Sequence, residues 1–109
     1  MNDSALSLLG LCRKAGKLSL GHDSCKAALN AGAARLCIIC SDASDRLKEE
    51  ISSLSEKAGV RTFDVSYSMM DIKYATNFKA AVFTVDDEGF ANSLINKIND
   101  NQTGKERGL

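Results

Sequence analysis

The chain of 109 residues contains no proline, no tryptophan and a single histidine, His22. No apolar run is long enough to span a membrane, and no apolar secretory segment with a cleavage site stands near the first residue. We therefore expect a cytoplasmic protein without membrane contact. One histidine and one closely spaced cysteine pair cannot supply the ligands of a usual zinc site, so we also expect no metal.

The cysteines are few and poorly placed for chemistry. They are Cys12, Cys25, Cys37 and Cys40. The last two lie in the apolar run "LCIIC", where residues three apart on a strand face opposite sides. A redox-active pair instead stands at the start of a helix, which lowers the thiol pKa. We expect four buried, reduced cysteines.

An excess of positive charge is also missing, because 14 acidic residues balance 14 basic ones. The chain as a whole therefore lacks the basic character typical of many nucleic-acid-binding proteins. The first 35 residues are nevertheless basic, with five Lys or Arg against two Asp. This part of the chain can attract a local anionic partner.

What the sequence does contain is a regular alternation of helix and strand patterns within the length of one domain. Helices are predicted for 4–15, 23–32, 42–59, 68–75 and 86–98, and strands for 17–21, 35–41, 60–65 and 80–85. The pattern indicates an α/β fold, and we expect a three-layer α-β-α sandwich. Periodicity leaves the strand order open. We expect one domain over 1–99 and a polar, frayed tail over 100–109.

The first helix carries apolar residues at Leu8, Leu11, Cys12 and Ala15, a spacing that predicts its buried stripe. Its end is predicted at Gly16, after two basic residues in the last turn.

The stretch "GHDSCKAALNAG" over 21–32 places a glycine turn before a helix. Free backbone N–H groups at a helix start attract phosphate, and Lys17, Lys26 and His22 flank this turn. A carboxylate such as that of Asp23 repels phosphate but can accept hydrogen bonds from the amino groups of a base edge. The alternative is that Asp23 or Ser24 merely caps the helix, and the stretch by itself leaves both readings open.

Two other arrangements could indicate catalysis or metal binding, but the case for each is weak. His22 and Cys25 lie one helical turn apart, as a nucleophile and its base would, but no third group orients them. The acidic turns at 41–45 and 86–89 follow buried strands, where a magnesium ion could bind, yet Asp42 or Ser44 can equally cap the next helix. We expect no enzyme.

The segments "LGLCRKAGKLSLG", "CKAALNAGAARLCIICSDAS" and "VFTVDDEGFANSL" resemble the ribosomal-protein superfamily that binds kink-turn RNA. This superfamily includes the large-subunit ribosomal proteins seven-Ae and thirty-e, and the branch most similar to this chain is that of small bacterial YlxQ-type proteins. The resemblance extends from residue 4 to residue 98. It implies an α-β-α sandwich with a mixed four-stranded sheet.

The resemblance also implies an RNA-binding surface made of three loops, of which the first contacts the sheared G·A pairs of the kink. This chain departs from the family pattern in three places, one of which is the usual glycine-lysine pair before the last strand, replaced here by Asn77-Phe78-Lys79. The usual Asn-Glu pair after the glycine is replaced by Asp23 and Ser24, and the usual lysine is replaced by Ala27, with Lys26 one position earlier. The implied RNA-binding residues, with the neighbouring lysines, are Lys17, Gly21, His22, Asp23, Ser24, Lys26, Asp42, Asn77 and Lys79.

Together these observations predict a non-enzymatic protein that binds kink-turn or other structured RNA and is associated with the ribosome or translation. No cofactor, metal or small-molecule substrate is expected. The alternative is a protein-interaction module that keeps the fold but has lost specific kink-turn recognition. Zero net charge and the displaced lysine favour this alternative.

Overall fold

The computed structural model describes residues 3–108, in which helices and strands alternate strictly. The elements in chain order are α1 (Ser4–Lys14), β1 (Leu18–Leu20), α2 (His22–Asn30), β2 (Leu36–Ile39), α3 (Asp45–Ala58), β3 (Thr62–Val65), α4 (Met69–Thr76), β4 (Val82–Val85), α5 (Glu88–Asn101) and β5 (Gly104–Glu106). Within the described residues no helix has the length and apolar character needed to cross a bilayer.

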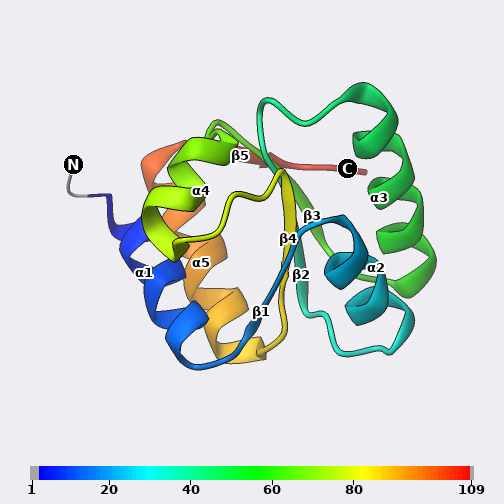
Figure 1. Cartoon of the computed structure of the whole chain (residues 1–109), viewed down its shortest axis with the longest axis horizontal. Helices are drawn as coiled ribbons and strands as arrows, with labels where there is room; N and C mark the ends of the chain where they lie inside the picture. Colours follow the sequence, from blue (N-terminus) through cyan, green and yellow to red (C-terminus); the bar gives the residue numbers. More distant parts are fainter. Residues whose placement is uncertain (1–2, 109) are drawn as a thin grey trace.

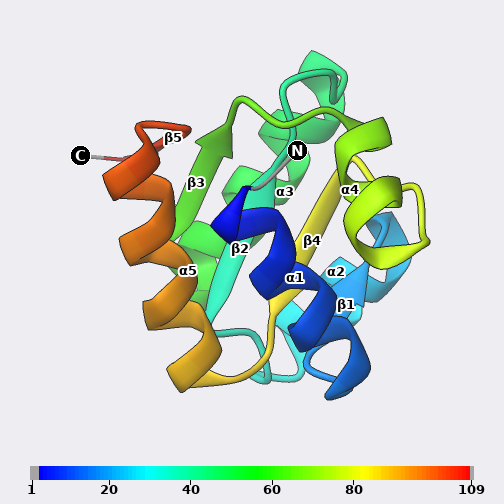
Figure 2. The ribbon, with the colours of Figure 1, turned by 90° about the vertical axis from the view of Figure 1, so that its left-hand side faces the viewer.

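The strands form one mixed sheet in the order β1-β4-β2-β3-β5. Only β2 and β3 run parallel, whereas the other neighbouring pairs are antiparallel. Helices α1, α4 and α5 lie on one side of the sheet, and α2 and α3 lie on the other (Figures 1 and 2). The predicted three-layer α-β-α sandwich is confirmed.

The core consists of two apolar clusters separated by the sheet, and β2 contributes to both. Leu36 and Ile38 belong to the cluster beneath α1 and α5, while Cys37 and Ile39 belong to the cluster beneath α2 and α3. All four residues of β2 are buried. This explains why its sequence is continuously apolar, since a central strand faces helices on both sides.

All four cysteines are buried and free, as the sequence predicted. Burial raises the pKa of Cys12 to about 11 and that of Cys40 to about 12. Both thiols therefore remain protonated at neutral pH and serve as small apolar groups of the core.

The predicted stripe of α1 is confirmed at Cys12 but wrong at Leu11 and Ala15, which are exposed, while Leu8 is half-buried. The buried residues of α1 are Ala5, Leu6, Leu9 and Cys12, whereas Leu11 is 57% exposed. Leucines stand at positions 6, 8, 9 and 11, so they lie on more than one face of the helix. Since α1 packs against both α4 and α5, its tertiary neighbours select the buried face.

The tail also differs from expectation, because residues 104–106 form a fifth strand on a sheet expected to have four. Strand β5 pairs antiparallel with β3. Two ion pairs flank the pairing: Arg61 donates two hydrogen bonds of 2.7 Å to Glu106, and Arg107 lies 2.5 Å from Asp64. Backbone pairing with an available sheet edge thus orders a polar segment that has no apolar pattern of its own.

Candidate functional site

Three loops meet at one end of the sheet, where strands β1 and β2 end and strand β4 begins. The Gly21 N–H donates to the Val82 carbonyl at 3.0 Å, and the Cys40 N–H donates to the Ala81 carbonyl at 2.8 Å. These bonds hold residues 21–24, 41–44 and 77–79 side by side. We call this surface the loop edge.

The first loop is the start of α2. Gly21 is the N-cap residue, with φ of 96° and ψ of 170°, and it provides no side-chain cap. The interpretation of Asp23 or Ser24 as N-cap is therefore wrong. The first bond of the helix runs from the Cys25 N–H to the Gly21 carbonyl, so the preceding N–H groups stay available. His22, Asp23 and Ser24 are all exposed at this helix start.

His22 and Lys26 lie one turn apart on α2 and share one acidic partner on α3. His22 Nε2 and Lys26 Nζ lie 3.1 Å and 3.2 Å from the same carboxylate oxygen of Glu50. Hydrogen bonds from His22 and Lys26 lower the pKa of the Glu50 carboxyl. The displaced lysine thus points toward α3, and its charge is partly neutralised there.

Asp42 lies in the second loop, and its side chain binds a backbone N–H group at the start of α4. Its carboxylate accepts the Met69 N–H at 3.0 Å, next to Ser68, which caps the helix in a reciprocal pair with Asp71. The start of α3 is capped by Ser44 instead. Asp42 is therefore an anchor between two loops. Among residues 3–108, no group of three or more His, Cys, Asp or Glu is arranged to hold a metal ion.

The third loop follows α4 and presents an aromatic ring. Asn77 ends the helix in a left-handed conformation, with φ of 63°. Phe78 is 44% exposed, and its ring lies 3.7 Å from the position that a Cβ on Gly21 would occupy. The guanidinium of Arg13 lies 5.9 Å from the centre of this ring. With exposed Lys79 beside it, this loop joins the end of α1 to the start of α2.

Lys17 is the one predicted site residue that the structure does not bring to the loop edge. It precedes β1, and its carbonyl accepts the Asp86 N–H at the opposite edge of the sheet. The three residues of β1 lie between it and Gly21, and the four steps along the extended chain correspond to about 13 Å. Spacing in the sequence could not show that β1 separates these two positions.

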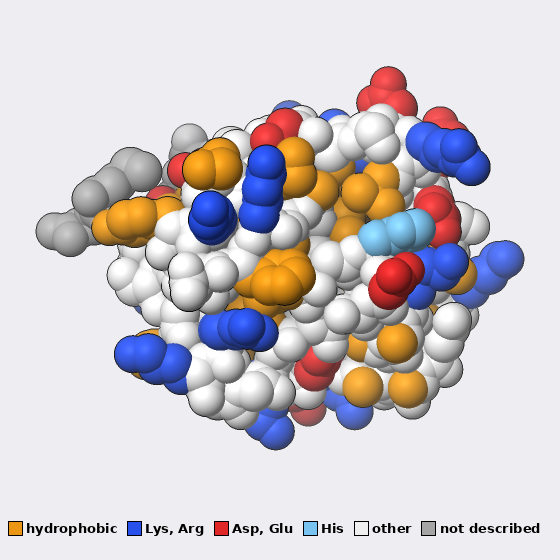
Figure 3. Space-filling model, in the orientation of Figure 1, with side chains coloured by type: hydrophobic (Ala, Val, Ile, Leu, Met, Phe, Trp, Pro, Cys, Tyr) orange, Lys and Arg blue, Asp and Glu red, His pale blue; other side chains and the backbone are white. Residues whose placement is uncertain are grey.

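Sequence reasoning missed the residues on the α1 and α4 side of this face, namely Arg13, Lys14, Lys73, Tyr74 and Phe78. All five are exposed. Figure 3 shows lysine and arginine side chains gathered on that half of the surface, around a central hydrophobic patch. The stretch "KYATNFK" interleaves aromatic and basic residues, and this pattern was the signal available in the sequence.

The geometry does not support the pairing of Cys25 with His22. Cys25 is fully buried, and a hydrogen bond with Cys37 together with burial raises the pKa of its thiol. His22 instead faces solvent and Glu50. A nucleophile has to be accessible and activated, and Cys25 is neither.

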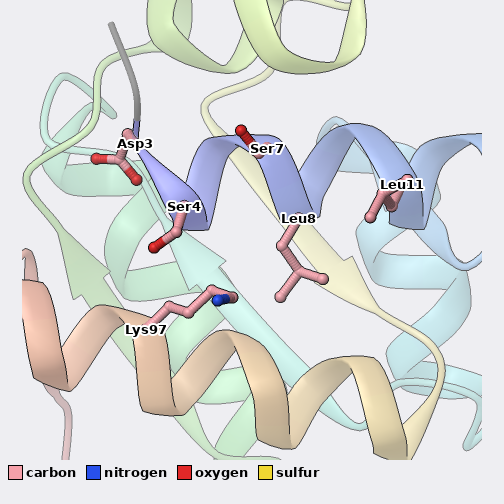
Figure 4. Close-up of a pocket in the computed structure, with 6 residues that line it drawn as sticks. All are labelled: Asp3, Ser4, Ser7, Leu8, Leu11 and Lys97. Atoms are coloured by element: carbon pink, nitrogen blue, oxygen red, sulfur yellow. The ribbon is translucent and has the colours of Figure 1, made fainter.

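Two grooves run along α1 on the same side of the sheet. One, of about 580 Å³, lies between α1 and α4 and adjoins the loop edge through Asn77. The other, of about 440 Å³, lies between α1 and α5, where Leu8 and Lys97 point into the space between the helices (Figure 4). Only the first is lined by an aromatic side chain, that of Tyr74.

The fold and the loop edge define a small α/β domain that presents a free helix start beside basic and aromatic side chains. Comparison with known proteins identifies the family. The chain belongs to the ribosomal protein L7Ae/L30e/S12e/Gadd45 family, whose sequence pattern it matches over residues 3–95. The family expected from the sequence is confirmed.

Individual relatives agree with this assignment. The RNA-binding protein YlxQ of Enterococcus faecium is 30% identical over 87 residues, which cover 80% of this chain and 84% of that protein. A protein of unknown function from Bacillus halodurans superposes with a TM-score of 0.83 at 26% identity, over 90% of this chain and 99% of the other. The 15.5kD RNA binding protein of Giardia lamblia shares the fold, with a TM-score of 0.69 at 20% identity over 87% and 82% of the two chains.

Proposed function

We propose that this protein binds structured RNA through the loop edge and has no catalytic activity of its own. The observation that carries the proposal is the free start of α2, with Asp23 and Ser24 exposed, in a member of this family. A relative that is 30% identical is named an RNA-binding protein. The proposed role requires no cofactor, and we place the protein in the cytoplasm, associated with ribosomes or translation.

The loop edge offers two kinds of contact to an RNA. The N–H groups at the start of α2, together with Lys79 and Arg13, suit phosphate oxygens, which fix the position of the RNA. Asp23 and Ser24 can accept and donate hydrogen bonds at base edges, which carry sequence information. Gly21 has no Cβ, so a backbone or base can approach closely there.

The finer proposal is that the RNA is a kink-turn. A kinked duplex exposes base edges that a straight A-form helix keeps in its narrow major groove, so a compact protein edge can read them. Asp23 and Ser24 take the positions at which the resemblance implies contact with the sheared G·A pairs. Asn77 and Lys79 would contact the opposite side of the kink.

The test is a titration of a kink-turn hairpin and a straight hairpin, followed by fluorescence anisotropy at about 50 and 200 mM salt. We expect tighter binding to the kinked hairpin, with a log–log salt slope near −0.9 for each phosphate neutralised. Asp23→Ala should reduce the preference for the kink by about tenfold, because each base contact contributes on the order of 1–3 kcal/mol.

Two lysines form a matched pair of controls. Lys79→Ala at the loop edge should make the salt slope shallower by about one contact, whereas Lys17→Ala at the opposite edge should leave it unchanged. Both side chains are exposed, so neither change should disturb the fold. Equal and weak binding to both hairpins would contradict kink-turn recognition.

One observation favours the alternative of an interaction module that has lost this specificity. Glu50 neutralises the charge of Lys26 near the start of α2, and the carboxylate of Glu50 repels phosphate there. This alternative predicts that Lys26→Ala and Lys79→Ala both leave the association in cells unchanged. Sedimentation of the tagged variants with ribosomes, in gradients of low and high salt, distinguishes the two functions.

A further inference from the structure

The groove between α1 and α4 lies outside the loop edge but is continuous with it. Arg13 and Lys14 line the groove from the end of α1, and Tyr74 and Asn77 line it from α4 and its end. The Tyr74 side chain is 76% exposed. An aromatic ring this exposed contributes little to the core, so it is available to a partner that enters the groove.

The groove is basic as well as aromatic. Arg13 and Lys14 make no ion pair within residues 3–108, and exposed Lys73 adds a third cation on α4. One acidic residue, Asp3, lies at the far end. Its carboxylate is already occupied, because it accepts two backbone N–H groups that start α1 and the hydroxyl of Tyr67.

Met70 extends the exposed apolar surface along α4. It lies one turn before Tyr74, so the two side chains are neighbours on one helix face, and Met70 is 57% exposed. Flat apolar surface flanked by cations is the combination that stacks an unpaired base and neutralises its phosphates. A peptide partner would need both acidic side chains to match the cations and a planar side chain to stack on Tyr74, whereas every nucleotide carries a planar base and a phosphate.

We propose that a single-stranded RNA segment occupies this groove, with one base stacked on Tyr74 and its phosphates held by Arg13 and Lys14. This rests on the proposed function, since the segment would be the unpaired strand that leaves the structured RNA bound at the loop edge. The loop edge thus binds the folded part of the RNA, and the groove binds its flank. The neighbouring groove between α1 and α5 has one lysine and no aromatic ring, so it lacks this chemistry.

The first experiment compares a kink-turn hairpin with the same hairpin carrying a five-nucleotide uridine extension, placed at either end in turn. The extended RNA should bind the unaltered protein about tenfold more tightly, as stacking of one base predicts. Tyr74→Ala should abolish this gain and leave the plain hairpin unaffected, while Tyr74→Phe should retain the gain. Lys97→Ala in the neighbouring groove is the matched control for loss of one charge, and Lys14→Ala should weaken the extended RNA selectively.

A second measurement uses the tyrosine emission of the protein, which has two tyrosines and no tryptophan. Tyr74 is exposed and Tyr67 is buried, so a base that stacks in the groove should quench the emission, and Tyr74→Phe should remove the quenching. Isolated oligouridine separates the two proposals. Quenching by the oligomer without hairpin preference would retain the groove and refute kink-turn recognition. Hairpin preference without quenching or gain from the extension would overturn the groove proposal and leave the groove to a protein partner.

Discussion

A single carboxylate, that of Glu50, controls how much positive charge the start of α2 offers to an RNA. It lies within 3.2 Å of both His22 Nε2 and Lys26 Nζ, and all three groups face solvent at the border of the loop edge. An anion that approaches the free N–H groups of α2 therefore meets a neutralised lysine and a nearby acid. This contact, together with the exposed carboxylate of Asp23, is an electrostatic obstacle to phosphate binding at that helix start.

The first prediction follows from this contact. Glu50→Gln removes the negative charge and frees Lys26, so RNA should bind about fivefold more tightly at low salt, with a salt slope steeper by up to one phosphate contact. Anisotropy titrations at several salt concentrations measure both quantities. Glu49→Gln is the matched control, because this exposed neighbour on α3 makes no ion pair with α2 among the described residues. An equal gain from both variants would show a general charge effect and reject the specific role of Glu50.

The local sequence predicted that the start of α2 is exposed. It did not predict which residues the side chains of this helix start contact. The glycine turn before "HDSC" correctly located a helix start with polar residues at its mouth. Glu50 was missed because it lies 24 residues beyond Lys26, and only the packing of α2 on α3 brings them together. Lys17 was expected beside Gly21 because the two are close in the sequence. The whole of β1 lies between them, however, so they stand at opposite ends of that strand.

At the scale of elements, apolar pattern and capping signals were sufficient for nine of the ten described helices and strands. The helix start at Ser44 and the left-handed Gly59 that ends α3 are both signalled by residue type. The exception is β5, which contains no apolar residue at all. It forms because β3 offers an unpaired edge and because Arg61 and Arg107 find acidic partners across the pair, and neither condition is visible in a local window.

The second prediction concerns the docking of β5. A Cβ on Gly104 would lie 2.8 Å from the Ile98 side chain and 2.9 Å from the Asp64 carbonyl, closer than such atoms approach in proteins. Gly104→Ala should therefore lower the free energy of unfolding by about 1–3 kcal/mol, the usual cost of overpacking. Lys105→Ala, at an exposed position of the same strand, should change it by less than about 0.5 kcal/mol. Urea unfolding measures the difference, and hydrogen exchange at the Ser66 N–H, which donates to the Thr103 carbonyl, should show whether β5 has left its partner. Unchanged stability in Gly104→Ala would mean that β5 contributes little to the fold.

At the scale of the whole molecule, one hydroxyl connects the two ends of the described chain. Tyr67, between β3 and α4, donates to the Asp3 carboxylate at 2.8 Å, and its oxygen lies 3.2 Å from the Thr103 hydroxyl. Asp3 begins α1, while Thr103 precedes β5. Periodicity revealed the layers of this molecule but not its strand order, because the order depends on long-range contacts of this kind.

The last prediction tests that connection through its pH dependence. Burial, together with the neighbouring Asp3, raises the pKa of Tyr67 to about 12, whereas an exposed tyrosine titrates near pH 10. The unfolded chain therefore loses this proton first. The stabilisation is complete below about pH 10 and declines as the pH rises toward 12, by about 1–2 kcal/mol. Urea unfolding between pH 8 and 11.5 should show a steeper decline for the unaltered protein than for Tyr67→Phe, and Tyr74→Phe should retain the steep decline because its ring is exposed. Parallel curves for the unaltered protein and Tyr67→Phe would show that the hydroxyl does not hold the two ends together.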